Sequence, residues 1–387
     1  MFKNISIIAI GNGFSLLLHF LMFPVIAKLV GPEIFGEYGY IYAIVQTIGF
    51  VCLLNLNKLL IASNEKNVDN IFTGGVLLSL IICMSWLLLI KLFDFNFHAI
   101  ISIPLLFFIM LNELLLSNLY RLEQFYSISI ITIFKKTSIS ILLLSAVFFY
   151  KSFILMLFIT LIVEIIYFLV FIFFIKAKPI INLNKLNIKL LYNKDFVLIK
   201  TIQDILNRVS AQLPIIYVKN YIGSFETGQY YFANKMIQSP MGVVTKAIRS
   251  VFFIKLSKDL NSFKTVILIK IVLIYLLFGV IGFLSLYFFE NLFINLLDKS
   301  WSDSYKFFYY LFPMLISNSM ASIFRDKMLL SGKNLFLLYL DVILTIIRIS
   351  VFFLALKTGM LLINYIAIIA ITLIFFNILT LFFSFKK

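Results

Sequence analysis

Residues 153–176 have the sequence FILMLFITLIVEIIYFLVFIFFIK, in which Glu164 is the only acidic residue and Lys176 the only basic one. A helix that crosses the hydrocarbon core of a membrane needs about 20 mostly apolar residues, and this stretch is long enough. A membrane β-barrel would show shorter segments of alternating polarity instead. The stretch therefore predicts a membrane-spanning helix.

Similar apolar runs recur along the whole chain of 387 residues. Hydrophobic residues make up 62% of the chain and charged residues 13%, whereas soluble domains have about 45–50% and about 25%. This composition excludes a soluble globular protein and predicts an all-α integral membrane protein. We expect twelve spanning helices, in residues 5–27, 38–57, 72–91, 99–119, 127–149, 153–176, 197–218, 229–248, 264–289, 304–324, 334–356 and 359–384.

Basic residues are distributed unevenly between these runs. If both termini are cytoplasmic, the inner connections hold 22 of the 33 Lys and Arg residues and six of the 17 acids, whereas the outer loops hold seven of each. Cytoplasmic loops of membrane proteins carry an excess of Lys and Arg. We therefore expect a multi-pass membrane protein with both termini cytoplasmic. The net charge of +16 does not predict nucleic-acid binding, because no soluble basic patch carries it.

The chain divides near its middle, where residues 177–196 form the longest inner connection. We expect this Lys- and Asn-rich segment to link an N-terminal six-helix lobe, residues 1–176, to a C-terminal six-helix lobe, residues 197–387. Alternatively, its Ile, Leu and Lys residues form a short amphipathic helix on anionic headgroups.

A repeated motif indicates that the two lobes are related. Residues 31–38 read GPEIFGEY and residues 223–230 read GSFETGQY, so both match G-x4-G-x-Y at an offset of 192 residues. Six predicted helices separate the copies, so both halves enter the membrane in the same direction and form a parallel repeat. The first helix of each repeat contains a proline, Pro24 or Pro214, which we expect to bend it.

Residues 27–38, AKLVGPEIFGEY, resemble the basic-x-x-Gly-Pro-x-x-Phe-Gly-x-Tyr stretch of the Wzx-type polysaccharide flippases, which belong to the multidrug/oligosaccharidyl-lipid/polysaccharide (MOP) exporter superfamily. Residues 223–230 and Ser331-Gly332-Lys333 support the resemblance, and topology and length agree over essentially the whole chain. Lys28 departs from the Arg of many members. Lysine keeps the charge but lacks the fork that binds phosphate through two hydrogen bonds.

The resemblance implies a MATE-like architecture of two six-helix lobes around a central cavity. It also implies a function in the bacterial inner membrane: moving a polyprenyl diphosphate-linked oligosaccharide, such as an O-antigen or capsule repeat unit, from the inner to the outer leaflet by alternating access. The implied partners are this lipid-linked oligosaccharide diphosphate, membrane lipids and a polysaccharide polymerase.

Besides the residues counted with the inner and outer connections, eight ionisable residues are left inside the predicted spans: Glu113, Glu164, Asp204, Arg208, Lys235, Lys270, Asp341 and Arg348. Such residues are costly in a membrane and usually face the bundle interior or an aqueous cavity. We expect the diphosphate and sugar acids to bind the cationic members of this group, except Lys270, together with two residues nearer the cavity ends; these candidates are Arg208, Lys235, Lys28, Arg249 and Arg348. Lys270 instead reaches the headgroups.

The same charges also have structural interpretations. Asp204 and Arg208 are four residues apart, and Asp341 and Arg348 seven apart, so each pair lies on nearly one helix face and can neutralise itself. Glu113 and Glu164 are candidates for carrying a coupling proton or cation. Alternatively, these two glutamates only accept hydrogen bonds from neighbouring helices.

No motif for catalysis, cofactor binding or metal binding is visible in the sequence. We therefore expect no enzyme, no cofactor and no metal. Two alternative functions remain. One is a cation-coupled multidrug or small-molecule exporter of the same fold, which would need a more acidic cavity. The other is a membrane polysaccharide polymerase, which would need a larger extramembrane segment.

Overall fold

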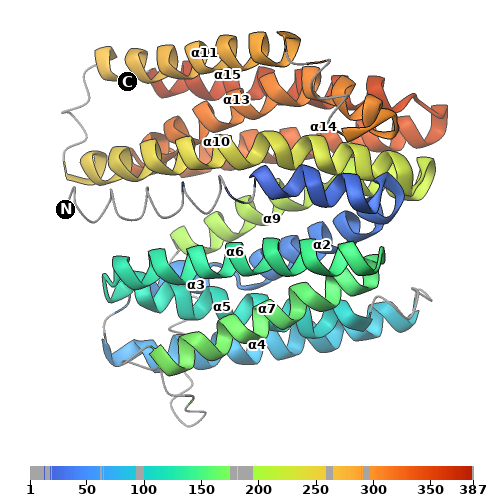
Figure 1. Ribbon diagram of the computed structural model, residues 1–387. Helices are drawn as coiled ribbons and strands as arrows, with labels where there is room; N and C mark the ends of the chain where they lie inside the picture. The colour runs from blue at the N-terminus through green and yellow to red at the C-terminus, as the bar shows by residue number, and fades with distance from the viewer. Residues whose placement is uncertain are drawn as a thin grey trace. The chain divides into compact units, whose positions relative to one another are not determined.

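The computed structural model describes residues 13, 18, 20–61, 63, 65–92, 100–174, 181, 195–258, 265–288, 290 and 297–385. These residues are helical almost throughout, and they contain no strand (Figure 1). After a first helix at Phe20–Val30, the elements are α2 (Pro32–Cys52), α3 (Leu56–Ile61), α4 (Glu65–Leu92), α5 (Ser102–Arg121), α6 (Phe125–Phe149), α7 (Phe153–Phe174), α9 (Asp195–Tyr217), the π-helix η3 (Val218–Ile222), α10 (Ser224–Lys258), α11 (Thr265–Phe288), the 3-10 helix η4 (Lys299–Trp301), α13 (Ser302–Leu330), α14 (Asn334–Thr358) and α15 (Leu362–Phe385).

Each of the twelve predicted runs overlaps a helix of this set, which confirms the all-α fold class. Among the described residues, seven helices are long and apolar enough to cross a membrane; they lie in α4, α5, α6, α7, α13, α14 and α15. Shorter apolar helices occur at Phe20–Val30 and Ile269–Ser285. The model therefore has the long apolar helices of a multi-pass membrane protein.

The second helix is shifted toward the N-terminus from its predicted range, 38–57. It begins at Pro32, directly after Gly31, whose φ of 84° lies in the left-handed region, where glycine is favoured. Proline suits the first turn of a helix because it has no N–H to leave unpaired. The helix ends at Cys52, before Leu54 and Asn55, which also have positive φ angles.

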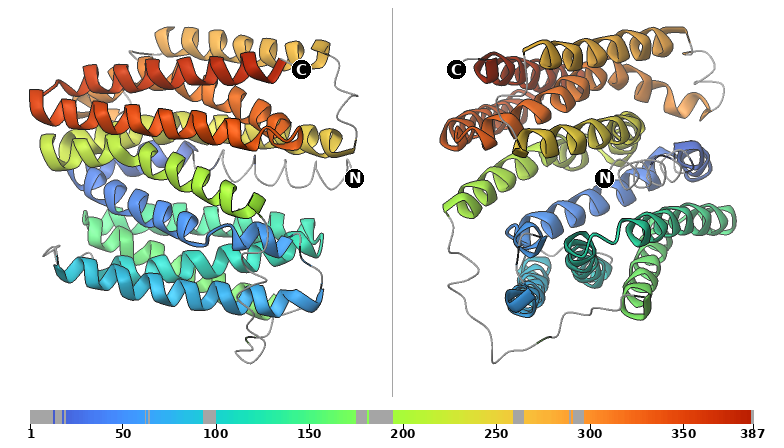
Figure 2. Two further views of the ribbon diagram at one scale, coloured as in Figure 1. Left: turned by 180° about the vertical axis from the view of Figure 1, so that it is seen from behind. Right: turned by 90° about the vertical axis from the view of Figure 1, so that its left-hand side faces the viewer.

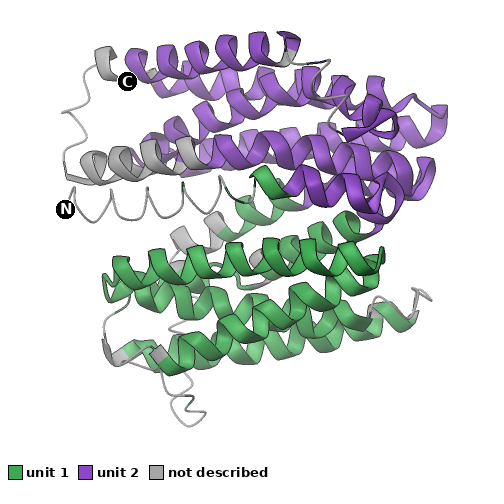
Figure 3. Ribbon diagram, viewed as in Figure 1, with its two compact units in different colours: residues 1–22, 38–208 green, residues 23–37, 209–387 purple. Residues whose placement is uncertain are grey.

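The chain forms two compact units (Figure 3). Unit 1 comprises residues 1–22 and 38–208, and unit 2 comprises residues 23–37 and 209–387. The predicted linker, residues 177–196, lies outside the described residues except for Ile181 and the start of α9. The predicted lobe boundaries therefore stay a prediction.

One helix is central to the packing of each unit. In unit 1, α5 contacts α3, α4, α6 and α7. In unit 2, α13 contacts α10, α11, α14 and α15. Figures 1 and 2 show these neighbours running side by side from three directions.

The turns that follow α5 and α13 have the same backbone pattern. Gln124 N donates to Leu119 O, and Lys333 N donates to Met328 O, at 3.1 and 3.0 Å. Glu123 and Gly332, which precede the two donors, both have positive φ angles, 54° and 79°. Because α5 and α13 are the fourth and the tenth of the twelve predicted helices, this match supports the internal repeat.

The two copies of the repeated motif meet within unit 2. A Cβ atom on Gly36 would lie 2.0 Å from the carbonyl oxygen of Ser224, and one on Gly228 would lie 1.9 Å from that of Pro32. Only glycine allows the first turn of α2 to approach α10 so closely. Ser224 Oγ also donates to Glu37 Oε1 at 2.6 Å, and Lys219 forms an ion pair with Glu37. The motif is therefore a packing element.

Candidate functional site

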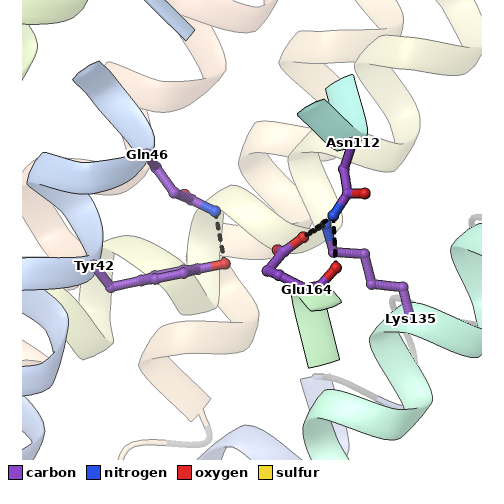
Figure 4. Close-up of polar contacts among 5 residues, drawn as sticks. All are labelled: Tyr42, Gln46, Asn112, Lys135 and Glu164. Atoms are coloured by element: carbon purple, nitrogen blue, oxygen red, sulfur yellow. Dashed lines mark hydrogen bonds and ion pairs between the residues drawn. The ribbon is translucent and has the colours of Figure 1, made fainter. Parts of the chain in front are cut away.

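Unit 1 buries an ion pair between α6 and α7. The carboxylate of Glu164, which is 1% exposed, accepts hydrogen bonds from Lys135 Nζ at 2.7 Å and from Asn112 Nδ2 at 2.8 Å (Figure 4). Asn112 Nδ2 also donates to the backbone oxygen of Glu164 at 3.0 Å. The Lys135 ammonium lies 4.4 Å from the centre of the Tyr167 ring. The charges of this group balance, and its carboxylate accepts bonds from two helices.

Aromatic and amide side chains surround this ion pair. Tyr42 points toward Glu164 from α2, and its hydroxyl accepts a hydrogen bond from Gln46 Nε2 at 2.8 Å (Figure 4). The ring of Tyr38, the last residue of the first motif copy, stacks on that of Tyr42 with centroids 5.5 Å apart. Tyr38 also hydrogen-bonds to Thr160 at 3.3 Å. The glutamate therefore lies among groups that hydrogen-bond to one another.

Glu113, the other candidate for ion coupling, lies on α5 in the same unit. Its Oε1 atom accepts a hydrogen bond from Asn57 Nδ2 at 3.4 Å. Both glutamates thus accept hydrogen bonds from neighbouring helices, as the structural interpretation expects. Their role in coupling stays a prediction.

Unit 2 buries a group with a different charge balance. Asp341 on α14, 1% exposed, forms an ion pair with Arg325 on α13, with 2.7 Å between Oδ1 and Nη2. Arg348, two turns further along α14 and 6% exposed, donates from Nη1 to the Ser210 hydroxyl at 2.7 Å. Arg348 also interacts electrostatically with Arg325, Asp341, Tyr230 and Tyr365. Asp341 therefore interacts with two guanidinium groups, those of Arg325 and Arg348.

The spacing of Asp341 and Arg348 along one helix predicted that these two residues pair with each other. The structure instead gives Asp341 an ion pair with Arg325 from a neighbouring helix. Arg348 remains within electrostatic range of Asp341, so the predicted pair shares a site with a third charge that the prediction did not include.

The remaining candidates are more exposed. Lys235, on α10 in unit 2, is half-buried, and its ammonium lies 5.5 Å from the centre of the Tyr231 ring. Lys28, also in unit 2, has a 42% exposed side chain and lies 3.4 Å from Asp298. On α9 in unit 1, Arg208 is exposed and Asp204 half-buried.

Two further expectations concern Arg249 and the proposed pairing of Arg208 with Lys235. Arg249 belongs to α10, but its side chain lies outside the described residues, as do both histidines, His19 and His98. Arg208 belongs to unit 1 and Lys235 to unit 2. A diphosphate site shared by these two cations therefore stays a prediction.

Sequence reasoning missed two half-buried cations that pair with buried carboxylates, Lys135 and Arg325. The count of inner connections includes both of them. Lys135 lies inside the predicted run 127–149, so the range itself contained the signal. Arg325 follows the predicted run 304–324 directly, but α13 continues to Leu330. The predicted end of this helix was therefore too early to include Arg325 among the intramembrane charges.

The sequence was compared with protein families and curated proteins, and the fold with solved structures. Residues 1–258 match the family model described as "Polysaccharide biosynthesis protein". No curated protein matches the chain.

Solved structures match the fold over nearly the full length. An outward-facing structure of a multidrug resistance MATE family transporter of the MOP superfamily has a TM-score of 0.67 at 14% identity, covering 99% of this chain and 94% of that one. An inward-facing structure of such a transporter has a TM-score of 0.68 at 14% identity, covering 97% of each chain. A MOP superfamily transporter from Pyrococcus furiosus, whose title reports a binding pocket of reverse polarity, has a TM-score of 0.59 at 13% identity, covering 99% and 94%.

These findings confirm the predicted family and fold class. The matched region includes both copies of the motif, and the transporter fold accounts for the apolar helices that follow it. The chain therefore belongs to the polysaccharide biosynthesis protein family and has the multi-pass membrane fold of the MOP superfamily of transporters.

Proposed function

We propose that the protein is a flippase that moves a polyprenyl diphosphate-linked oligosaccharide from the inner to the outer leaflet of the bacterial inner membrane. The observation that carries this proposal is the family match over residues 1–258 on a transporter fold. The related fold occurs in both an outward-facing and an inward-facing structure. Alternating access between two such states would expose the substrate to one leaflet at a time.

The intramembrane cations support an anionic substrate. A diphosphate needs charged donors, and Arg and Lys supply strong, charge-assisted hydrogen bonds. In this proposal Arg208 and Lys235 bind the diphosphate, with Lys28 and Arg249 nearer the ends of its path. Lys235 is half-buried beside the Tyr231 ring and Arg208 is exposed, so neither side chain is enclosed by the protein.

The proposed topology agrees with contacts between loop residues. With both termini inside, the connections between the predicted spans put Lys28, Glu37, Lys219 and Asp298 on the outer side. Lys28 pairs with Asp298, and Lys219 with Glu37. Lys327, assigned to the inner side, donates to the backbone oxygen of Ser384 near the C-terminus at 2.8 Å. These contacts support an inner C-terminus. A polysaccharide polymerase on the outer face would consume the product and is the proposed functional partner.

The test is complementation of a strain from which the gene has been deleted. We expect lipid-linked oligosaccharide to accumulate on the inner leaflet and the wild-type gene to clear it. Arg208→Ala and Lys235→Ala should fail to clear it while inserting at normal levels. Lys270→Ala is the matched control, because Lys270 is an exposed lysine of α11 and should not contact the substrate. Full clearance by Arg208→Ala and Lys235→Ala would contradict the site.

A multidrug exporter is the second candidate, and the solved MATE structures favour it. The same deletion strain separates the candidates. An exporter predicts unchanged lipid intermediates and greater sensitivity to cationic drugs. A polymerase predicts that unpolymerised units reach the outer leaflet. The proposed flippase predicts neither result.

A further inference from the structure

The charged groups that interact with Arg348 do not balance its charge. Arg325 and Arg348 carry two positive charges, and Asp341 is the carboxylate that interacts with both. A guanidinium group has five N–H donors. The hydrogen bond resolved for Arg348 is the one from Nη1 to Ser210 Oγ, and its Nε atom has no partner among the described residues. Arg348 therefore has more charge and more donors than its surroundings use.

A second unused donor lies within electrostatic range of this arginine. Tyr365, on α15, is fully buried, and its hydroxyl has no hydrogen-bond partner in the described part of the chain. Tyr365 and Arg348 interact electrostatically. The Tyr365 ring is packed against Tyr217, with centroids 4.5 Å apart, and the Tyr217 hydroxyl donates to Met360 O at 2.9 Å. Packing thus holds the Tyr365 hydroxyl in place without giving it an acceptor.

Such an arrangement destabilises the protein when no ligand is bound to these groups. A buried charge without a counter-charge and a buried donor without an acceptor both destabilise a protein, most strongly within a membrane. An anion that accepts hydrogen bonds from Arg348 and Tyr365 would remove both costs. The close burial of these groups limits the ligand to a small group.

We propose that Arg348 and Tyr365, with the hydroxyl of Ser210, form an anion-binding site inside unit 2 that takes a carboxylate. A carboxylate is planar and accepts two parallel hydrogen bonds from a guanidinium group. The carboxylate belongs either to a free small acid or to an acidic sugar. With an acidic sugar as its source the inference rests on the proposed function, and binding to the purified protein tests the site separately from transport.

The test is thermal unfolding of the full-length protein in detergent, at constant pH and ionic strength. Sodium acetate, sodium glucuronate and glucose serve as probes. A ligand that binds only the folded state raises the unfolding temperature with its concentration. We expect acetate or glucuronate to raise it and glucose to leave it unchanged. Tighter binding of glucuronate than acetate supports a sugar acid, and binding of acetate alone supports a free anion.

Two variants show whether the shift comes from this site. Arg348→Gln should abolish the carboxylate-dependent shift. Tyr365→Phe should weaken the apparent affinity at least about five-fold, and it removes only an unpaired hydroxyl, so it should fold as well as the wild type without added acid. Lys306→Gln, in an exposed ion pair with Asp303, is the control and should keep the full shift. A shift that survives in both Arg348→Gln and Tyr365→Phe, or no shift with either acid, overturns the proposal.

Discussion

The two units bury their charges in opposite ways. In unit 1, Lys135 and Glu164 neutralise each other, and Asn112 adds a further hydrogen bond to the glutamate. In unit 2, Arg325 and Arg348 have Asp341 in common. Each group includes residues from neighbouring helices, but only the second has an excess of one charge among the described residues. Balanced charges hold helices together, whereas an excess charge indicates a ligand.

The last residue of the repeated motif shows the same difference between the two units. That residue is Tyr38 in the first copy and Tyr230 in the second. Tyr38 interacts electrostatically with Glu164, and Tyr230 with Arg348. The same motif position therefore lies near a buried acid in unit 1 and near a buried cation in unit 2. The two halves share a backbone pattern but differ in the charge that they bury.

The largest expected effect comes from removing the carboxylate that interacts with both Arg325 and Arg348. Asp341→Asn leaves these two guanidinium groups without that counter-charge, and breaking a buried ion pair typically costs about 3–5 kcal/mol. We expect a loss at the upper end of that range, measured as the free energy of unfolding in an SDS titration of the purified protein. A double variant, Asp341→Asn with Arg348→Gln, should recover part of the loss; no recovery would mean that the two residues are not coupled.

An intermediate effect is expected in unit 1. Glu164→Gln leaves one unpaired cation, and the Lys135 side chain is 23% exposed, so its long stem can move the ammonium toward water or headgroups. We expect a loss near the lower end of about 3–5 kcal/mol in the same titration. Lys135→Met in the Glu164→Gln background should restore stability. If Glu164→Gln costs more than Asp341→Asn, the contrast between the units is wrong.

The smallest effect is expected from removing the excess charge itself. Arg348→Gln leaves the Arg325–Asp341 pair neutral and retains an amide that can donate to Ser210, so the loss without added acid should stay below about 1 kcal/mol. Unfolding with and without acetate measures it. A loss as large as that of Asp341→Asn would show that Arg348 is fully compensated in the native protein.

The sequence predicted the helices well and their charge partners poorly. Apolar runs of about 20 residues are a local signal, and every one of them overlaps a helix in the structure. The ion pair of Asp341 depends on Arg325, sixteen positions away on another helix, and spacing along one helix cannot reveal such a partner. The motif glycines were recognised as a repeat, but their mutual contact through Ser224 and Pro32 depends on how two distant helix starts pack.

The sequence by itself determined the all-helical membrane fold, the internal repeat and the family, because hydrophobic length and short motifs are properties of contiguous residues. Only the tertiary structure decided that Lys135 forms an ion pair with Glu164, and Arg325 with Asp341. It also decided that Arg348 Nε and the Tyr365 hydroxyl have no hydrogen-bond partner among the described residues. The physical reason is that a buried charge selects its partner by distance in space across neighbouring helices. That distance is set by packing and is not encoded in the spacing along either helix.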